Sequence, residues 1–181
     1  EQIQKVMMEA YTKYKGEASG KNADYIKALA EVDSNLFGIS IVTADGKSYN
    51  VGDSDALFSI QSISKVFTFA KTIEDHGAKK MQETVGVNAT GLAFNSIMAI
   101  EQHGGSASNP FVNAGAIQSV SGVTANNTTD RWNTIKANMD AFAGRTLPFN
   151  DKVYQSEVND NKRNQAISKL LDAYGRMGSD P

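Results

Sequence analysis

Apolar residues recur at three- and four-residue intervals over several stretches, the pattern of helices that bury one face. One stretch covers residues 3–14 and is closed by Gly16. Another begins near Ser62 and ends at His76, directly before a glycine that favours helix termination. The same periodicity predicts helices at 24–30, 78–85, 95–101, 114–120, 129–143 and 164–174.

The two longest apolar patterns also predict which side chains are buried. We expect the buried face of the first helix to consist of Ile3, Val6, Met7, Ala10, Tyr11 and Tyr14. We expect that of the helix after Ser62 to consist of Ile63, Val66, Phe67, Ala70 and Ile73.

Residues 37–51 have a different pattern, rich in β-branched and aromatic side chains. Asp45-Gly46 is a strong signal for a tight turn, so we predict a β-hairpin. No convincing strand pattern follows residue 51. Because a two-stranded hairpin is rarely stable alone, we expect the sheet to be completed by chain outside this sequence.

Composition narrows the class of protein. The 181 residues, 40% of them hydrophobic, suit one globular domain or a large part of a bigger one. The net charge of −2 gives no basic surplus for nucleic acid or an anionic membrane. Without cysteine, the chain excludes thiol catalysis, disulfides and cysteine-based zinc sites.

Targeting and membrane signals are absent from the sequence pattern. No apolar stretch approaches the ~20 residues that span a bilayer, and residues 1–5 do not resemble a secretory signal. We therefore expect no nucleic-acid or membrane partner and a cytoplasmic location, with an earlier cleaved signal left open.

Ser62 and Lys65 form a Ser-x-x-Lys motif at the start of a predicted helix. Positions three apart share a helix face, so the amine is expected beside the hydroxyl. A lysine can remove the serine proton when burial lowers its pKa. The motif is common by chance, and a capping serine followed by an exposed lysine has the same pattern. Ser59 and Ser64 are rival hydroxyls, but neither precedes a lysine by three residues.

The wider sequence resembles the bacterial and mitochondrial glutaminase family. The resemblance is centred on Phe58-Ser59-Ile60-Gln61-Ser62-Ile63-Ser64-Lys65, which is similar to that family's nucleophile segment. Further similar stretches follow the family order at 24–30, 41–46, 91–96, 109–117, 155–157 and 163–167. The resemblance as a whole spans about residues 3 to 174, and several ordered pieces are far more specific than one.

This resemblance implies an α+β fold of the β-lactamase/transpeptidase type. In that fold an antiparallel sheet with flanking helices packs against a helical domain, and the last strands are missing from this chain. We expect residues 1–181 to form a single incomplete domain. Residues 1–60 would hold the N-terminal helices and the hairpin, and residues 61–181 a mainly helical region with the nucleophile and pocket residues.

The resemblance also implies an amidohydrolase that converts L-glutamine to L-glutamate and ammonia without a cofactor. Ser62 would be the acyl-enzyme nucleophile and Lys65 its base. The implied substrate-binding residues are Tyr25, Ser62, Asn113, Glu157 and Asn164. The family further implies a homo-oligomer, either a dimer or a tetramer.

The residue types suit that substrate. A buried carboxylate such as Glu157 can pair with an α-ammonium group. The amides of Asn113 and Asn164 can donate to a carboxylate and accept from an amine. The backbone N–H of Ser62 would supply half of an oxyanion hole.

Each of these residues also has a simpler interpretation. Tyr25 could be a packing residue, Asn113 and Asn164 could cap helices, and Glu157 could be a solvated loop charge. His76 and His103 have no metal-ligand partner at suitable spacing, so we predict no metal site.

Two other functions remain open at this point. A β-lactamase or penicillin-binding-type hydrolase would share the Ser-x-x-Lys motif, but no Ser-x-Asn element follows the nucleophile. The second open function is that of a catalytically inactive fragment that binds glutamine.

Overall fold

The computed structural model describes residues 1–179, which form two compact units. The first contains residues 1–59 and 150–160, and the second contains residues 60–149 and the chain from residue 161 onwards. The expected single domain over residues 1–181 includes Asp180 and Pro181, which lie outside the described residues. That expectation, with its boundary near residue 60, stays a prediction.

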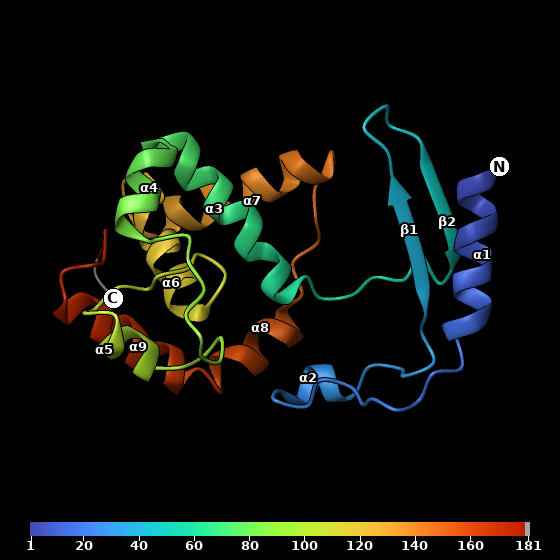
Figure 1. Ribbon diagram of the computed structural model, residues 1–181, viewed down its shortest axis with the longest axis horizontal. Helices are drawn as coiled ribbons and strands as arrows, with labels where there is room; N and C mark the ends of the chain where they lie inside the picture. Colours follow the sequence, from blue (N-terminus) through green and yellow to red (C-terminus); the bar gives the residue numbers. More distant parts are fainter. Residues whose placement is uncertain (180–181) are drawn as a thin grey trace. The chain divides into compact units, whose positions relative to one another are not determined.

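The first unit is built on a helix and a hairpin. Helix α1 (Gln2–Tyr14) lies along strands β1 (Gly38–Val42) and β2 (Ser48–Gly52), as Figure 1 shows. The strands pair antiparallel, with Gly38 opposite Gly52 and Val42 opposite Ser48. The hairpin and its Asp45-Gly46 turn were predicted correctly.

The helix meets the hairpin at a close approach that requires glycine. Gly52 has φ +69°, and a Cβ there would lie 2.3 Å from the Tyr11 ring and 2.4 Å from the Phe37 carbonyl. The Tyr11 and Phe37 rings stack at 5.4 Å between centroids. Glycine at residue 52 therefore lets the hairpin meet the helix.

The predicted buried face of α1 is largely wrong. Met7 is buried, at 3% exposure, whereas Val6 is 56% and Tyr14 50% exposed. Ile3 is also exposed, and Ala10 and Tyr11 are only half-buried. A two-stranded hairpin offers a surface too narrow to cover the whole apolar stripe.

Two short helices complete the first unit. Helix α2 (Lys27–Ala30) packs on α8 (Asp151–Val158), where Ser156 Oγ accepts from the Ala28 N–H at 3.4 Å. Helix α2 is shorter than predicted, because Ile26, and not Asp24, occupies its N-cap position. Helix α8 was not predicted at all, although Asn150 caps it by accepting from the Val153 N–H.

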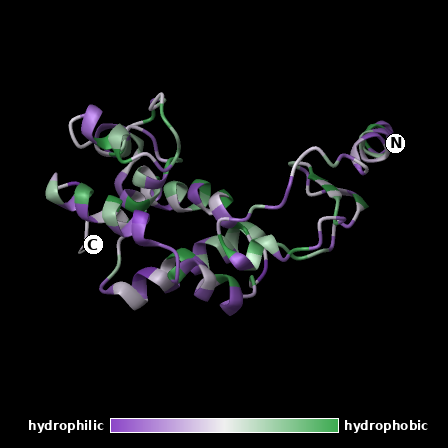
Figure 2. Cartoon of the chain, turned by 90° about the horizontal axis from the view of Figure 1, so that it is seen from below, coloured by the Kyte–Doolittle hydropathy of each residue, from purple (hydrophilic) through white to green (hydrophobic). Residues whose placement is uncertain are grey.

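The second unit consists of helices, most of which were predicted within a few residues. They are α3 (Ser64–His76), preceded by the 3₁₀ helix η1 (Gln61–Ile63), then α4 (Ala78–Thr84), α5 (Met98–Gln102), α6 (Asn113–Gly122), α7 (Thr128–Ala143) and α9 (Lys162–Ala173). Hydrophilic and hydrophobic residues alternate along the helices, as expected for amphipathic helices (Figure 2). Within residues 1–179, no helix combines the length and apolar character needed to cross a bilayer.

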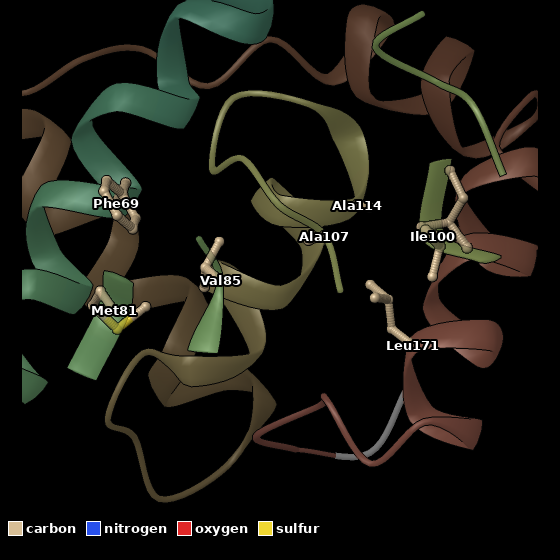
Figure 3. Close-up of a cluster of buried hydrophobic side chains, with 8 residues drawn as sticks. Phe69, Met81, Val85, Ile100, Ala107, Ala114 and Leu171 are labelled. Carbon is tan, nitrogen blue, oxygen red and sulfur yellow. The ribbon is translucent and has the colours of Figure 1, made fainter. Parts of the chain in front are cut away.

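One apolar core holds the second unit together (Figure 3). Its innermost side chains, Ile167 and Leu171 on α9, have no exposed surface. The core draws on α3, α4, α5, α6 and α9 and on two residues outside the helices, Val85 directly after α4 and the loop residue Ala107. Its members are Phe69, Met81, Val85, Ile100, Ala107, Ala114, Ile167 and Leu171.

The predicted buried face of α3 is also largely wrong, although Ile73 packs against the core. Val66 is 50% exposed, and Thr68, Phe69 and Thr72 are the residues buried. Ile63 is exposed as well, and Phe67, Ala70 and Ile73 are half-buried. Helix α3 packs against both α6 and α7, and the Thr72 hydroxyl donates to the Phe69 carbonyl at 2.8 Å. Because that hydroxyl is satisfied within its own helix, burying it carries little cost.

Candidate active site

The predicted nucleophile, Ser62, lies in the tight turn that leads into α3. Ser62 is the central residue of η1, and the helix proper begins two residues later. Gln61, just before it, has φ 44°, a conformation that is uncommon outside glycine. The Ser62 side chain is exposed. The rival hydroxyl of Ser64 instead donates to the Gln61 carbonyl at 2.7 Å.

The predicted base, Lys65, lies one turn later and points into a small polar network. Its Nζ donates to Asn113 Oδ1 at 2.7 Å and to the Phe111 carbonyl at 3.3 Å. The Phe94 ring centroid lies 5.7 Å from the same nitrogen. In turn, Asn113 Nδ2 donates to Asn164 Oδ1 at 3.0 Å. The structure thus joins three predicted site residues from α3, α6 and α9.

The surroundings of Lys65 make its ammonium form easier to deprotonate than a fully solvated one. Burial lowers the pKa of Lys65, because the ammonium form loses solvation. Among residues 1–179, Lys65 forms no ion pair, and it makes no hydrogen bond to the Ser62 hydroxyl. The amine therefore meets neutral acceptors, which do not hold its proton as a carboxylate would.

Neither asparagine in this network is a helix cap. Val112 is the N-cap of α6 and Asn161 that of α9, so Asn113 and Asn164 lie inside the first turns. The Asn113 backbone N–H donates to the Phe94 carbonyl at 2.8 Å. Both side chains are thus available for contacts beyond their own helices.

The other two predicted residues, Tyr25 and Glu157, meet within the first unit. They share a hydrogen bond between their side chains. Burial raises the pKa of the Glu157 carboxyl, and the Tyr25 hydrogen bond partly opposes this. The pKa of Tyr25 is raised by burial and then by the negative charge of Glu157. The predicted residues thus fall into two groups, one in each unit.

Sequence reasoning missed Phe94 and Phe111. Both belong to segments that resemble the family, but their contacts with Lys65 and Asn113 involve backbone carbonyls and an aromatic face. Such contacts leave no side-chain signature in a sequence. Only tertiary structure could identify them.

Residues 1–179 offer few side chains that could bind a metal ion together. No group of three or more histidine, aspartate or glutamate side chains could hold an ion there. His76 Nε2 contacts the Gly122 carbonyl and His103 Nδ1 the Ala99 carbonyl, each at 2.6 Å. The absence of a metal and of a cofactor stays a prediction.

Comparisons with known proteins point to one family. The glutaminase family model matches residues 20–181. A curated glutaminase from Colwellia psychrerythraea is 49% identical over 178 residues, which cover 98% of this chain and 57% of the relative. The solved structure of a probable glutaminase, ybaS, has a TM-score of 0.96 at 43% identity and matches 98% of this chain and 58% of its own.

A further solved structure shows Mglu in its L-glutamate binding form. Its TM-score is 0.88 at 30% identity, with 99% of this chain and 40% of the Mglu chain covered. The chain therefore spans about half the length of the curated relatives and solved proteins it matches.

These neighbours confirm the predicted fold class, a helix-rich α+β fold of the β-lactamase type with a small antiparallel sheet. The family match covers most of the residues, and the identities extend along nearly the whole chain. The chain belongs to the glutaminase family.

Proposed function

We propose that the protein containing this chain is an amidohydrolase that converts L-glutamine to L-glutamate and ammonia. Ser62 is its nucleophile and Lys65 its general base. The observation that carries the proposal is the setting of Lys65, a partly buried amine one turn after an exposed serine, facing only neutral acceptors.

The hydrogen bonds of Lys65 suit a base. A neutral amine has two N–H groups and one lone pair. The Phe111 carbonyl and Asn113 Oδ1 can occupy both N–H groups. The lone pair then remains for the serine proton. The Ser62 hydroxyl and the Lys65 amine come within hydrogen-bond reach when substrate binds, since catalytic hydrogen bonds often tighten only in that complex.

The reaction proceeds in two halves. Ser62 Oγ attacks the side-chain carbonyl carbon of glutamine while its proton passes to Lys65 Nζ. The tetrahedral adduct collapses, its C–N bond breaks, and the proton on Lys65 passes to the leaving nitrogen as ammonia departs. Water then attacks the γ-glutamyl ester, releases glutamate and restores the serine hydroxyl. The Ser62 backbone N–H stabilises the oxyanion in both halves.

The remaining residues hold the amino-acid end of glutamine. Glu157 pairs with the α-ammonium, and Tyr25, its hydrogen-bond partner, orients it. The amides of Asn113 and Asn164 donate to the α-carboxylate of glutamine and accept from its α-amine. A related protein, Mglu, has a solved L-glutamate binding form, which supports a site for this amino acid.

The family resemblance implies an oligomer, and the sequence pattern alone motivates the expected location. We propose a homo-oligomer, a dimer or a tetramer, in the cytoplasm. Light scattering coupled to size exclusion measures the first, and a single monomer mass would contradict it. Cell fractionation measures the second.

The test of the function combines turnover with trapping. The purified protein that contains this chain is mixed with L-glutamine, and ammonia and glutamate are measured with and without hydroxylamine, which intercepts a γ-glutamyl ester as the hydroxamate. Ser62→Ala abolishes both products, whereas Ser59→Ala retains them. Turnover by Ser62→Ala contradicts the proposal.

Two further measurements separate the alternatives. Hydrolysis of a chromogenic β-lactam in place of glutamine would favour a penicillin-binding-type hydrolase. Calorimetric binding of glutamine by both wild type and Ser62→Ala, with no ammonia released by wild type, would favour an inactive binding fragment.

A further inference from the structure

The loop before α6 is built unlike an ordinary surface loop. Ala107 is 2% and Ser108 7% exposed, and Pro110 is buried too. Ser108 has φ 62°, which is rare for a residue other than glycine, and its carbonyl accepts from the Asn88 N–H at 2.8 Å. A backbone conformation of this kind persists only where its surroundings hold it in place. The loop is therefore fixed by the core of the second unit, to which Ala107 belongs (Figure 3).

Asn109 is held from three sides. Its Oδ1 accepts from the Phe111 backbone N–H at 2.8 Å, and its Nδ2 donates to the Asn88 carbonyl at 3.1 Å. Its own carbonyl packs against Gly115 in α6, where a Cβ would lie 1.8 Å from the oxygen. The first contact is an Asx-turn, in which the side chain sets the direction of the backbone two residues on.

This turn determines where the Phe111 carbonyl points. The Phe111 N–H is fixed by Asn109, and the Phe111 ring packs edge-to-face on Phe69 at 6.1 Å. The carbonyl that follows lies 3.3 Å from Lys65 Nζ. We propose that Asn109 is a positioning residue for Lys65, because its Asx-turn keeps the Phe111 carbonyl as a fixed acceptor for one N–H of the lysine. The proposal rests on the function proposed above for its catalytic meaning, but the positional effect on Lys65 is measurable without glutamine.

The surroundings of Lys65 determine whether its pKa rises or falls when the Phe111 carbonyl is displaced. The groups facing its Nζ are the Phe111 carbonyl from the loop, Asn113 Oδ1 from α6 and the Phe94 ring. Within residues 1–179 no carboxylate or second cation pairs with it. A carbonyl acceptor stabilises the ammonium form, so losing it lowers the pKa of Lys65 further. Losing it also leaves the amine less well oriented.

The experiment follows the titration of Lys65 itself. Rates of acetylation by acetic anhydride are measured for each lysine by peptide mass spectrometry across pH in wild type, Asn109→Ala, Asn109→Gln and Asn109→Ser. Serine retains a hydroxyl that can accept from the Phe111 N–H, whereas alanine has no acceptor and glutamine is one methylene too long for the turn. Lys79, with a side chain that is 90% exposed, serves as the internal reference.

We expect the apparent pKa of Lys65 to fall by about half to one unit in Asn109→Ala and Asn109→Gln, the size expected for one hydrogen bond. Asn109→Ser stays near wild type, and Lys79 is unchanged in every variant. If Asn109→Ala fails to fold, Asn109→Gln carries the same expectation. An unchanged Lys65 titration in a folded loss variant overturns the proposal, as does an equal shift in the serine variant. A shift of the expected pattern in a chain that does not hydrolyse glutamine supports the positioning role and contradicts the proposed function alone.

Discussion

Asn113 Oδ1 accepts a 2.7 Å hydrogen bond from Lys65 Nζ, and this contact joins the first turns of α3 and α6. The same amide donates to Asn164 at 3.0 Å, so its orientation is fixed from both ends. With its oxygen facing the lysine, Asn113 offers a neutral acceptor at the position where a carboxylate would hold the proton firmly. The choice of asparagine at this position favours a lysine that can lose its proton.

Replacing that amide by a carboxylate therefore tests the electrostatics. Asn113→Asp should raise the pKa of Lys65, since a negative charge in contact favours the ammonium form. The fraction of neutral lysine at a given pH falls, so the acid limb of the kcat/KM profile for glutamine moves to higher pH by about one unit or more. Asn113→Ser, which adds no charge, is the control. An acid limb that stays in place in the aspartate variant would contradict this account.

Replacing the lysine by a cation that cannot act as a base tests its role in proton transfer. Lys65→Arg keeps the positive charge, but a guanidinium does not deprotonate in proteins. We expect kcat for glutamine to fall by about 10²- to 10⁴-fold, the usual contribution of a general base. Lys79→Arg, on the exposed face of α4, should be near wild type. Retained turnover in Lys65→Arg would mean that another group takes the serine proton.

A paired glycine substitution tests the approach of helix α6 to the loop. Gly115→Ala should destabilise the second unit by about 2–4 kcal/mol, because its Cβ would lie 1.8 Å from the Asn109 carbonyl. Gly122→Ala, at the other end of α6, has nothing within 4 Å of its Cβ and should change stability by less than about 1 kcal/mol. Urea unfolding followed by the fluorescence of Trp132 compares them. Equal stabilities would show that the loop yields to the methyl group.

A second glycine pair tests the first unit. Both Gly46 and Gly52 have positive φ, but only Gly52 would bring a Cβ into contact with Tyr11 and the Phe37 carbonyl. Gly52→Ala should therefore cost several-fold more free energy than Gly46→Ala, for which about 1 kcal/mol of backbone strain is expected. Hydrogen exchange of the β1 and β2 amides reports the difference. Similar exchange in the two variants would show that helix and hairpin separate readily.

The hydrogen bond between Tyr25 and Glu157 can be tested through the pKa of the Glu157 carboxyl. Tyr25→Phe removes the hydrogen bond that opposes the effect of burial, so the pKa of Glu157 should rise further above its ordinary value. Carbon-detected NMR titration of the carboxyl measures this directly. Tyr14→Phe, on the exposed end of α1, is the control. An unchanged Glu157 titration in Tyr25→Phe would show that the Tyr25 hydrogen bond does not lower the pKa of Glu157.

The sequence predicted local structure better than burial. Asp45-Gly46 identified the hairpin, and His76-Gly77 identified the end of α3, because turn and cap residues act within a few positions. The buried faces of α1 and α3 were wrong, because burial depends on which elements cover a helix. Helix α8 was missed because its apolar residues are few, although Asn150 and Asp151 form a recognisable start.

The same contrast between local signals and tertiary contacts holds for the candidate site. A motif and a family resemblance singled out Ser62, Lys65, Asn113 and Asn164, and three of these share one hydrogen-bonded network. Their roles stay predictions. The roles of Phe111 and Asn109 beside Lys65 could not be predicted. A backbone carbonyl carries no residue-type signal, and tertiary contacts determine its direction.

In the proposed mechanism, Ser62 becomes acylated because Lys65 takes its proton. Rapid-quench peptide mass spectrometry of the protein that contains this chain, mixed with L-glutamine at neutral pH, tests this step. We expect a γ-glutamyl ester on Ser62 in wild type and its loss in Lys65→Arg. Glutamate and ammonia formed without any acyl group on Ser62, or an ester that forms equally well in Lys65→Arg, would contradict it.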